Sequence, residues 1–174
     1  SLGFPEPLLA MQAHGCQITE TDLASYRPQH REPLVAARHG WTVVTNPPPA
    51  YGGEIIARAV SELDDYSYAG LTASLAAATA AVKGTLAATT GTTQISIVDA
   101  AGLVVSMTTT NGAGGGVLIP GTGIHLNNML GEDDLLPAGL DAVTPGERLR
   151  SMSAPTILLA PDGTVTATLS EAGL

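Results

Sequence analysis

The sequence predicts an α+β fold, with short helices in its first half and antiparallel hairpins in its second half. Between residues 54 and 63 the apolar side chains recur every three or four positions, which is the spacing of one helix face. From Thr92 onward the period changes to two, as in a half-buried strand. Glycine-containing turns at 100–102 and 162–163 join pairs of such strands. Together these patterns predict a sheet that packs under helices.

Local capping, turn and periodicity signals indicate the individual elements. Gly15 closes the first expected helix at its C-terminus, and a threonine caps the second at its N-terminus. Helices are expected at residues 5–14, from Thr19 or Thr21 to just before Pro28, at 54–63 and, as a core helix, at 70–86, with a connector at 85–91. Strands are expected at residues 33–37, 41–45, 92–99, 103–110, 155–159 and 164–169.

The composition fits one soluble domain and argues against several classes of function. At 174 residues the chain is long enough for a single domain with a real core. Its 16 acidic and 7 basic residues give a net charge of −9, which disfavours nucleic acid and anionic membranes as partners. No apolar run reaches the roughly 18 residues of a transmembrane helix. The single cysteine, Cys16, excludes an internal disulfide, and the four scattered histidines predict no metal site.

Two stretches resemble known motifs but lack the partners that the chemistry requires. The glycine-rich run 112–116 is not followed by the Lys-Ser/Thr pair of a phosphate-binding loop. The acidic residues 132–134 lack the ligand spacing of an EF-hand, so we expect a solvated loop or a clamp for a substrate amine there. No GxSxG motif is present. Threonine remains as the candidate nucleophile.

Gly91-Thr92-Thr93 stands at the start of the first alternating strand. A threonine hydroxyl is a weak nucleophile, but at a chain N-terminus the residue's own α-amine, with a pKa of about 8, serves as its base. Such a site requires that the peptide bond before Thr92 breaks, and Gly91 helps because glycine adopts strained φ values. The same residues also suit an ordinary strand start, so the pattern alone leaves both interpretations open.

Six segments carry a family resemblance. They are ITETDLASYRPQHREPL (18–34), NPPPAYGG (46–53), GTTQISIVDAAGLVVSMTTTNG (91–112), PGTGIHLNN (120–128), PGERLRSMSAPT (145–156) and LSEAGL (169–174). These segments resemble the γ-glutamyltransferase family, occur in the family's order and span most of the chain outside the alanine-rich run. On this basis the sequence is identified as a member of that family.

The resemblance implies the N-terminal-nucleophile hydrolase fold, an αββα sandwich in which two sheets stack between helical layers. We expect the sandwich to be incomplete in this chain, because most of the family's large subunit should precede Ser1 and its last elements should follow Leu174. The family's precursor cleaves itself, here between Gly91 and Thr92. Residues 1–91 then correspond to the C-terminal part of the large subunit and residues 92–174 to the N-terminal part of the small subunit, associated as one domain. The resemblance also favours a periplasmic or extracellular location.

The resemblance assigns roles to individual residues as well. Thr92 is the nucleophile of both processing and catalysis, and Thr110, or its neighbour Thr109, supports it through a hydroxyl group. Asn111 lies near the α-amino acid end of the substrate. The remaining roles are an ammonium contact at Asp134, with Asp133 or Glu132 as alternatives, a contact of Ser151 with the α-carboxylate, and an oxyanion hole at Gly173-Leu174.

The implied reaction is the transfer of a γ-glutamyl group from glutathione or a related compound. Thr92 attacks the γ-glutamyl amide, and water or an amino acid or peptide then takes the glutamyl group from the acyl-enzyme. No cofactor is needed, because the polypeptide supplies nucleophile, base and oxyanion donors. Gln94 and Arg150 depart from the family pattern and leave open a related threonine amidase that acts on a cephalosporin side chain or on poly-γ-glutamate. A truncated module without activity is the third interpretation.

Overall fold

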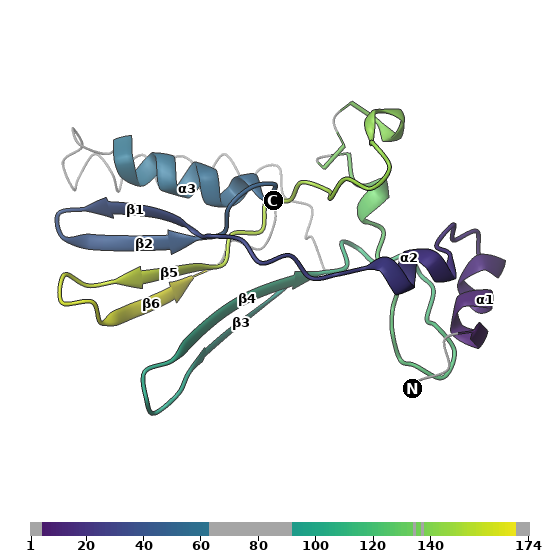
Figure 1. Ribbon diagram of the computed structural model, residues 1–174, viewed down its shortest axis with the longest axis horizontal. Helices are drawn as coiled ribbons and strands as arrows, with labels where there is room; N and C mark the ends of the chain where they lie inside the picture. The colour runs from purple at the N-terminus through teal and green to yellow at the C-terminus, as the bar shows by residue number, and fades with distance from the viewer. Residues whose placement is uncertain (1–4, 63–91, 134, 137, 170–174) are drawn as a thin grey trace.

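The computed structural model describes residues 5–62, 92–133, 135, 136 and 138–169 (Figure 1). It contains both helices and antiparallel strands, which confirms the α+β class. The elements are α1 (Pro5–Ala13), α2 (Glu20–Ser25), β1 (Leu34–Arg38), β2 (Trp41–Thr45), α3 (Tyr51–Glu62), β3 (Thr92–Val98), β4 (Val104–Thr110), the short 3-10 helices η2 (Met129–Gly131) and η3 (Leu140–Ala142), β5 (Thr156–Leu159) and β6 (Val165–Leu169). The helix expected at 70–86 and the connector at 85–91 lie outside the described residues.

The first two helices begin where the sequence signals predict, and α2 ends at Ser25, before the expected stop at Pro28. After α1, Gly15 takes the left-handed conformation with φ of 84°, which suits a glycine at a helix C-terminus. Of the two candidate caps of α2, the structure uses Thr19, whose hydroxyl accepts a hydrogen bond from the Asp22 backbone N–H at 3.2 Å. The Asp22 carboxylate in turn accepts the Thr19 backbone N–H at 2.7 Å, which completes a capping box. No helix within the described ranges is long and apolar enough to cross a membrane.

Four strands form an antiparallel sheet in the order β1-β2-β5-β6. β1 and β2 form one hairpin, β5 and β6 form another, and β2 pairs with β5 although the two strands are far apart in the sequence (Figure 1). Two of the most deeply buried side chains lie where these central strands begin and end. They are Thr45 and Thr156, each 3% exposed, and the Thr156 hydroxyl donates to that of Thr45 at 3.0 Å.

α3 packs against β1 and β2, and its first turn is pressed closely against the chain that leads into β5 (Figure 1). A methyl group at Gly52 would overlap the carbonyl oxygen of Met152, and one at Gly53 would overlap that of Asn46. The Asn46 amide also donates to the Ser153 carbonyl at 2.8 Å. The glycines are therefore needed for this close approach, which fixes the chain around residues 151–153 against the start of α3.

β3 and β4 form a separate two-stranded hairpin, which contacts the four-stranded sheet along β6. The two strands pair without a break from Thr92 opposite Thr110 to Val98 opposite Val104. The Asp99 carboxylate accepts the N–H groups of Ala101 and Leu103, both at 2.8 Å, and so stabilises the turn. The register of this hairpin decides which residues face Thr92.

Candidate active site

Thr92 and Thr110 lie directly opposite each other at the open end of the β3–β4 hairpin. The Thr92 hydroxyl donates to the Thr110 hydroxyl at 2.9 Å, and both side chains are half-buried. The Thr110 oxygen also accepts the backbone N–H of Gly112 at 3.0 Å. Thr109 pairs instead with Thr93, and both of these side chains are exposed. Of the two alternatives that the sequence leaves open, the structure therefore brings Thr110 to Thr92.

A network of hydrogen bonds continues along the same face of the hairpin. Gln94 donates to the Ser106 hydroxyl at 2.9 Å and accepts from the Thr108 hydroxyl at 2.7 Å. Ser106 reaches the neighbouring sheet, because its hydroxyl donates to the Leu169 carbonyl at 3.3 Å. Cross-strand side-chain bonds of this kind hold the register of an antiparallel pair. Sequence analysis missed the network, although polar residues at every second position of both strands were a usable signal.

Asn111 begins the glycine-rich loop that follows β4. Its carbonyl oxygen accepts the N–H groups of Gly114 at 3.0 Å and Asn128 at 3.2 Å, so the loop folds back beside the end of the hairpin. Its side-chain amide donates to the His125 carbonyl at 3.4 Å and is exposed. The Asn128 amide oxygen accepts a further bond from the Gly114 N–H at 3.2 Å. Gly114, with φ of 83°, takes a conformation that favours glycine.

Of the two acidic residues described in the 132–134 loop, Glu132 is the one that contacts the glycine-rich run 112–116. A methyl group at Gly112 would overlap the Glu132 carboxylate and the Asn128 amide oxygen, so both oxygens touch the glycine backbone. Gly112 in turn donates to Thr110, which connects the half-buried carboxylate to the threonine pair through one peptide unit. Asp133 is exposed, and Asp134, the preferred residue on sequence grounds, lies outside the described residues.

Ser151 occupies a different place, beside Ala50 and the first residue of α3. Its carbonyl oxygen accepts the Tyr51 N–H at 3.0 Å, and the half-buried side chain lines a groove together with Asn46 and Arg148. Within the described ranges the Ser151 hydroxyl makes no hydrogen bond. No hydrogen bond among the described residues therefore joins Ser151 directly to Thr92 or Thr110.

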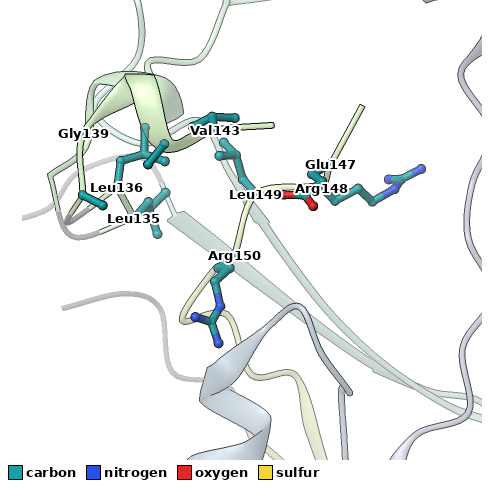
Figure 2. Close-up of a pocket in the computed structure, with 10 residues that line it drawn as sticks. Leu135, Leu136, Gly139, Val143, Glu147, Arg148, Leu149 and Arg150 are labelled. Atoms are coloured by element: carbon teal, nitrogen blue, oxygen red, sulfur yellow. The ribbon is translucent and has the colours of Figure 1, made fainter. Parts of the chain in front are cut away.

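An apolar hollow of about 290 Å³ lies over the loop before Ser151. Figure 2 shows Leu135, Leu136, Val143 and Leu149 around it. The Arg150 side chain extends away from these leucines towards the start of α3, where its guanidinium lies 5.9 Å from the centre of the Tyr51 ring. In the described part of the chain, His, Cys, Asp and Glu form no group of three that could hold a metal ion. The expected cleavage residue Gly91 and the expected oxyanion residues Gly173 and Leu174 lie outside the described ranges.

Comparison with known proteins places the chain in one family. The family model described as Gamma-glutamyltranspeptidase matches residues 8–88 and 71–173. The Acylase ACY 1 proenzyme of Pseudomonas sp. (strain SE83) is 29% identical over 202 residues, which cover 86% of this chain and 36% of the acylase. The Glutathione hydrolase proenzyme of Bacillus subtilis (strain 168) is 39% identical over 84 residues, or 47% of this chain and 14% of the hydrolase.

A plant relative gives a similar picture. Glutathione hydrolase 2 of Arabidopsis thaliana is 40% identical over 96 residues, which cover 48% of this chain and 16% of that protein. The chain therefore spans about a third of the length of the acylase and a smaller part of the two hydrolases. Because the family model matches almost all of the sequence, the chain belongs to the γ-glutamyltranspeptidase family.

Proposed function

We propose that this chain is part of a self-processing γ-glutamyltransferase or glutathione hydrolase in which Thr92 is the nucleophile. The peptide bond between Gly91 and Thr92 breaks, and the new α-amine of Thr92 takes the proton from the threonine hydroxyl. The hydroxyl oxygen then attacks the γ-glutamyl amide, the amine product leaves, and water or an amino acid or peptide takes the glutamyl group from the ester. Backbone N–H groups at Gly173-Leu174 stabilise the oxyanion.

The hydrogen bond between Thr92 and Thr110 is the observation that carries this proposal. It joins the proposed nucleophile to a second hydroxyl at 2.9 Å. The Gly112 N–H, which donates to the Thr110 oxygen at 3.0 Å, polarises that hydroxyl and makes it a better donor to an alkoxide on Thr92. Cross-strand threonine pairs also hold strand register, and this pair lies at the first residue of β3, directly after the peptide bond that the proposal breaks.

The names of the relatives support the processing step. Both the Pseudomonas and the Bacillus proteins are called proenzymes. We infer that residues 1–91 end a large subunit, that residues 92–174 begin a small one, and that the two stay associated after cleavage. The antiparallel sheet with α3 on one side fits one half of an αββα sandwich of the N-terminal-nucleophile hydrolase type.

Glu132 is our choice for the contact with the substrate ammonium group. Its carboxylate touches Gly112 and so lies one peptide unit from Thr110, which favours it over the exposed Asp133. Asp134 remains the sequence-based alternative, while Asn111 and Ser151 remain the proposed contacts of the α-amino acid end and the α-carboxylate.

Glu132→Gln is expected to raise KM at least tenfold and to leave the rate of self-cleavage within twofold of the parent rate. The control Asp133→Asn should change neither quantity. An equal loss of self-cleavage and substrate binding in Glu132→Gln would show that Glu132 has a structural role.

A related amidase is the second candidate, because the match to the acylase covers far more of this chain than the matches to the hydrolases. The two candidates share the Thr92 chemistry and differ in substrate. The test is a direct comparison of a γ-glutamyl anilide with a cephalosporin side-chain amide, with Thr92→Ala as the blank. Faster turnover of the anilide supports the transferase, faster turnover of the amide supports the amidase, and turnover by Thr92→Ala would exclude both.

A further inference from the structure

The Gln94 side chain uses both ends of its amide on the polar face of the β3–β4 hairpin. Its oxygen accepts from the Thr108 hydroxyl at 2.7 Å, and its nitrogen donates to the hydroxyls of Ser106 at 2.9 Å and Ser96 at 3.3 Å. Gln94, Ser106 and Thr108 are half-buried. The amide is therefore fixed in direction, with its oxygen towards Thr108 and its nitrogen towards Ser106.

The direction of this amide decides where the Ser106 proton points. A serine hydroxyl has one proton to donate, and its oxygen also accepts. Because the Ser106 oxygen accepts from the Gln94 nitrogen, the Ser106 proton is directed to another acceptor, the Leu169 carbonyl at 3.3 Å. Leu169 is the last residue of β6, which is the edge strand of the four-stranded sheet next to the hairpin (Figure 1). The bond from Ser106 thus ties the hairpin to the end of that sheet.

We propose that Gln94 is a positioning residue that holds the Thr92 hairpin against the end of β6 by orienting Ser106. The inference rests on the proposed function, in which Gly173-Leu174 supply the oxyanion donors. These donors follow Leu169 closely in the sequence, and Thr92 lies two positions before Gln94 on the same face of β3. The link from Gln94 through Ser106 to Leu169 therefore joins the strand of the nucleophile to the strand that precedes the oxyanion donors.

Loosening this link should slow the chemical step more than it weakens substrate binding. An oxyanion donor is effective only when it is held at the position where the negative charge develops. A small shift between nucleophile and donor therefore lowers kcat, while the groups that hold the rest of the substrate, and with them KM, are unchanged.

Gln94→Glu tests the link, because a glutamate has nearly the same shape and still accepts from Thr108 but cannot donate to Ser106. Its carboxylate instead takes the Ser106 proton, and the bond to Leu169 is lost. We expect kcat for a γ-glutamyl anilide, measured after self-cleavage is complete, to fall about three- to tenfold, the scale of one hydrogen bond, with KM within twofold of the parent value. Ser106→Ala should lower kcat by a similar factor, and Ser106→Thr, which keeps the hydroxyl, should recover most of it.

The double variant with Gln94→Glu and Ser106→Ala should be no slower than the slower single variant, because both changes break the same link. Ser96 offers two matched controls. It is exposed, its hydroxyl accepts from Gln94, and it makes no hydrogen bond to β6 among the described residues. Ser96→Ala removes a hydroxyl as Ser106→Ala does, and Ser96→Asp adds the same charge as Gln94→Glu. Both control variants should keep kcat within twofold of the parent value.

Amide hydrogen exchange in β6 gives a second readout that does not depend on turnover. Measured in the uncleaved Thr92→Ala background, exchange at the end of β6 should speed up about three- to tenfold in Gln94→Glu and in Ser106→Ala, and stay at the parent rate in the Ser96 variants. Parent-like kcat or unchanged exchange in Gln94→Glu, an equal loss in Ser96→Asp, a rise in KM in place of the fall in kcat, or additive losses in the double variant would each overturn the proposal. Turnover of the anilide by Thr92→Ala would instead refute the proposed function, and the exchange rates would still decide whether Gln94 holds the hairpin to β6.

Discussion

Replacing Thr110 by valine removes the hydroxyl that faces Thr92 and keeps a side chain of nearly the same shape. Two hydrogen bonds are lost, one from the Thr92 hydroxyl at 2.9 Å and one from the Gly112 N–H at 3.0 Å. A hydrogen bond between neutral groups contributes about 1 kcal/mol net, and somewhat more when its loss leaves a partly buried donor unpaired. If the transition state of self-cleavage needs the first bond, the barrier rises by about 1–2 kcal/mol, so cleavage slows roughly 5- to 30-fold.

The assay follows the appearance of the two fragments by intact-mass measurement after synthesis of the chain. Thr109→Val is the matched control, because Thr109 lies next along the same strand but pairs with Thr93 and is exposed. We expect Thr109→Val to cleave within about twofold of the parent rate, because only exposed contacts change. Thr110→Ser, which retains a hydroxyl, should recover most of the rate. Parent-like cleavage by Thr110→Val, or equal slowing in both valine variants, would refute the reasoning.

Three further predictions concern stability and pH. Gly112→Ala should destabilise the chain by about 2 kcal/mol or more, because the new methyl group would overlap two side-chain oxygens. Gly116 also has a positive φ, but a methyl group there meets open space, so Gly116→Ala should cost about 1 kcal/mol. Urea unfolding of both variants measures the difference in the free energy of unfolding. Thr156→Val should cost about 1–2 kcal/mol in the same assay, because its buried hydroxyl bonds Thr45 and a backbone carbonyl, and an unchanged midpoint would contradict that role. Hydrogen bonds from the hydroxyl and the backbone N–H of Thr19 lower the pKa of Asp22. The stabilising contribution of Asp22 should therefore be present above a pH of about 4 and fade as the pH falls through the lowered pKa. An ordinary or raised pKa of Asp22 in an NMR titration would contradict this prediction.

The register of the β3–β4 hairpin was predictable, because a hairpin is determined by its turn. The turn expected at 100–102 pairs residues that are equally far from it, and this puts Thr110, not Thr109, opposite Thr92. The helices and the remaining hairpins were also predictable from periodicity, capping residues and glycine turns. Such signals are local, so they predict elements within a few residues of their observed ends.

Contacts between distant segments were not predictable in this way. Glu132 reaches Gly112 through an irregular loop, and Asp134, the residue favoured by the family resemblance, lies outside the described residues. The pairing of β2 with β5 and the bond from Ser106 to Leu169 also join segments that no local pattern relates. Family resemblance supplies the expected roles of single residues, and the structure adds that Glu132, of the two described acidic residues in this loop, contacts Gly112.

Sequencing of the N-termini in the purified chain tests the central claim most directly. The account predicts a break between Gly91 and Thr92, with a new fragment that begins Thr-Thr-Gln-Ile, and it predicts that Thr92→Ala stays in one piece. A stable, uncut chain of 174 residues would support the interpretation of a truncated module without activity. The same break in Thr92→Ala would contradict the account, because it would show that Thr92 is not the processing nucleophile.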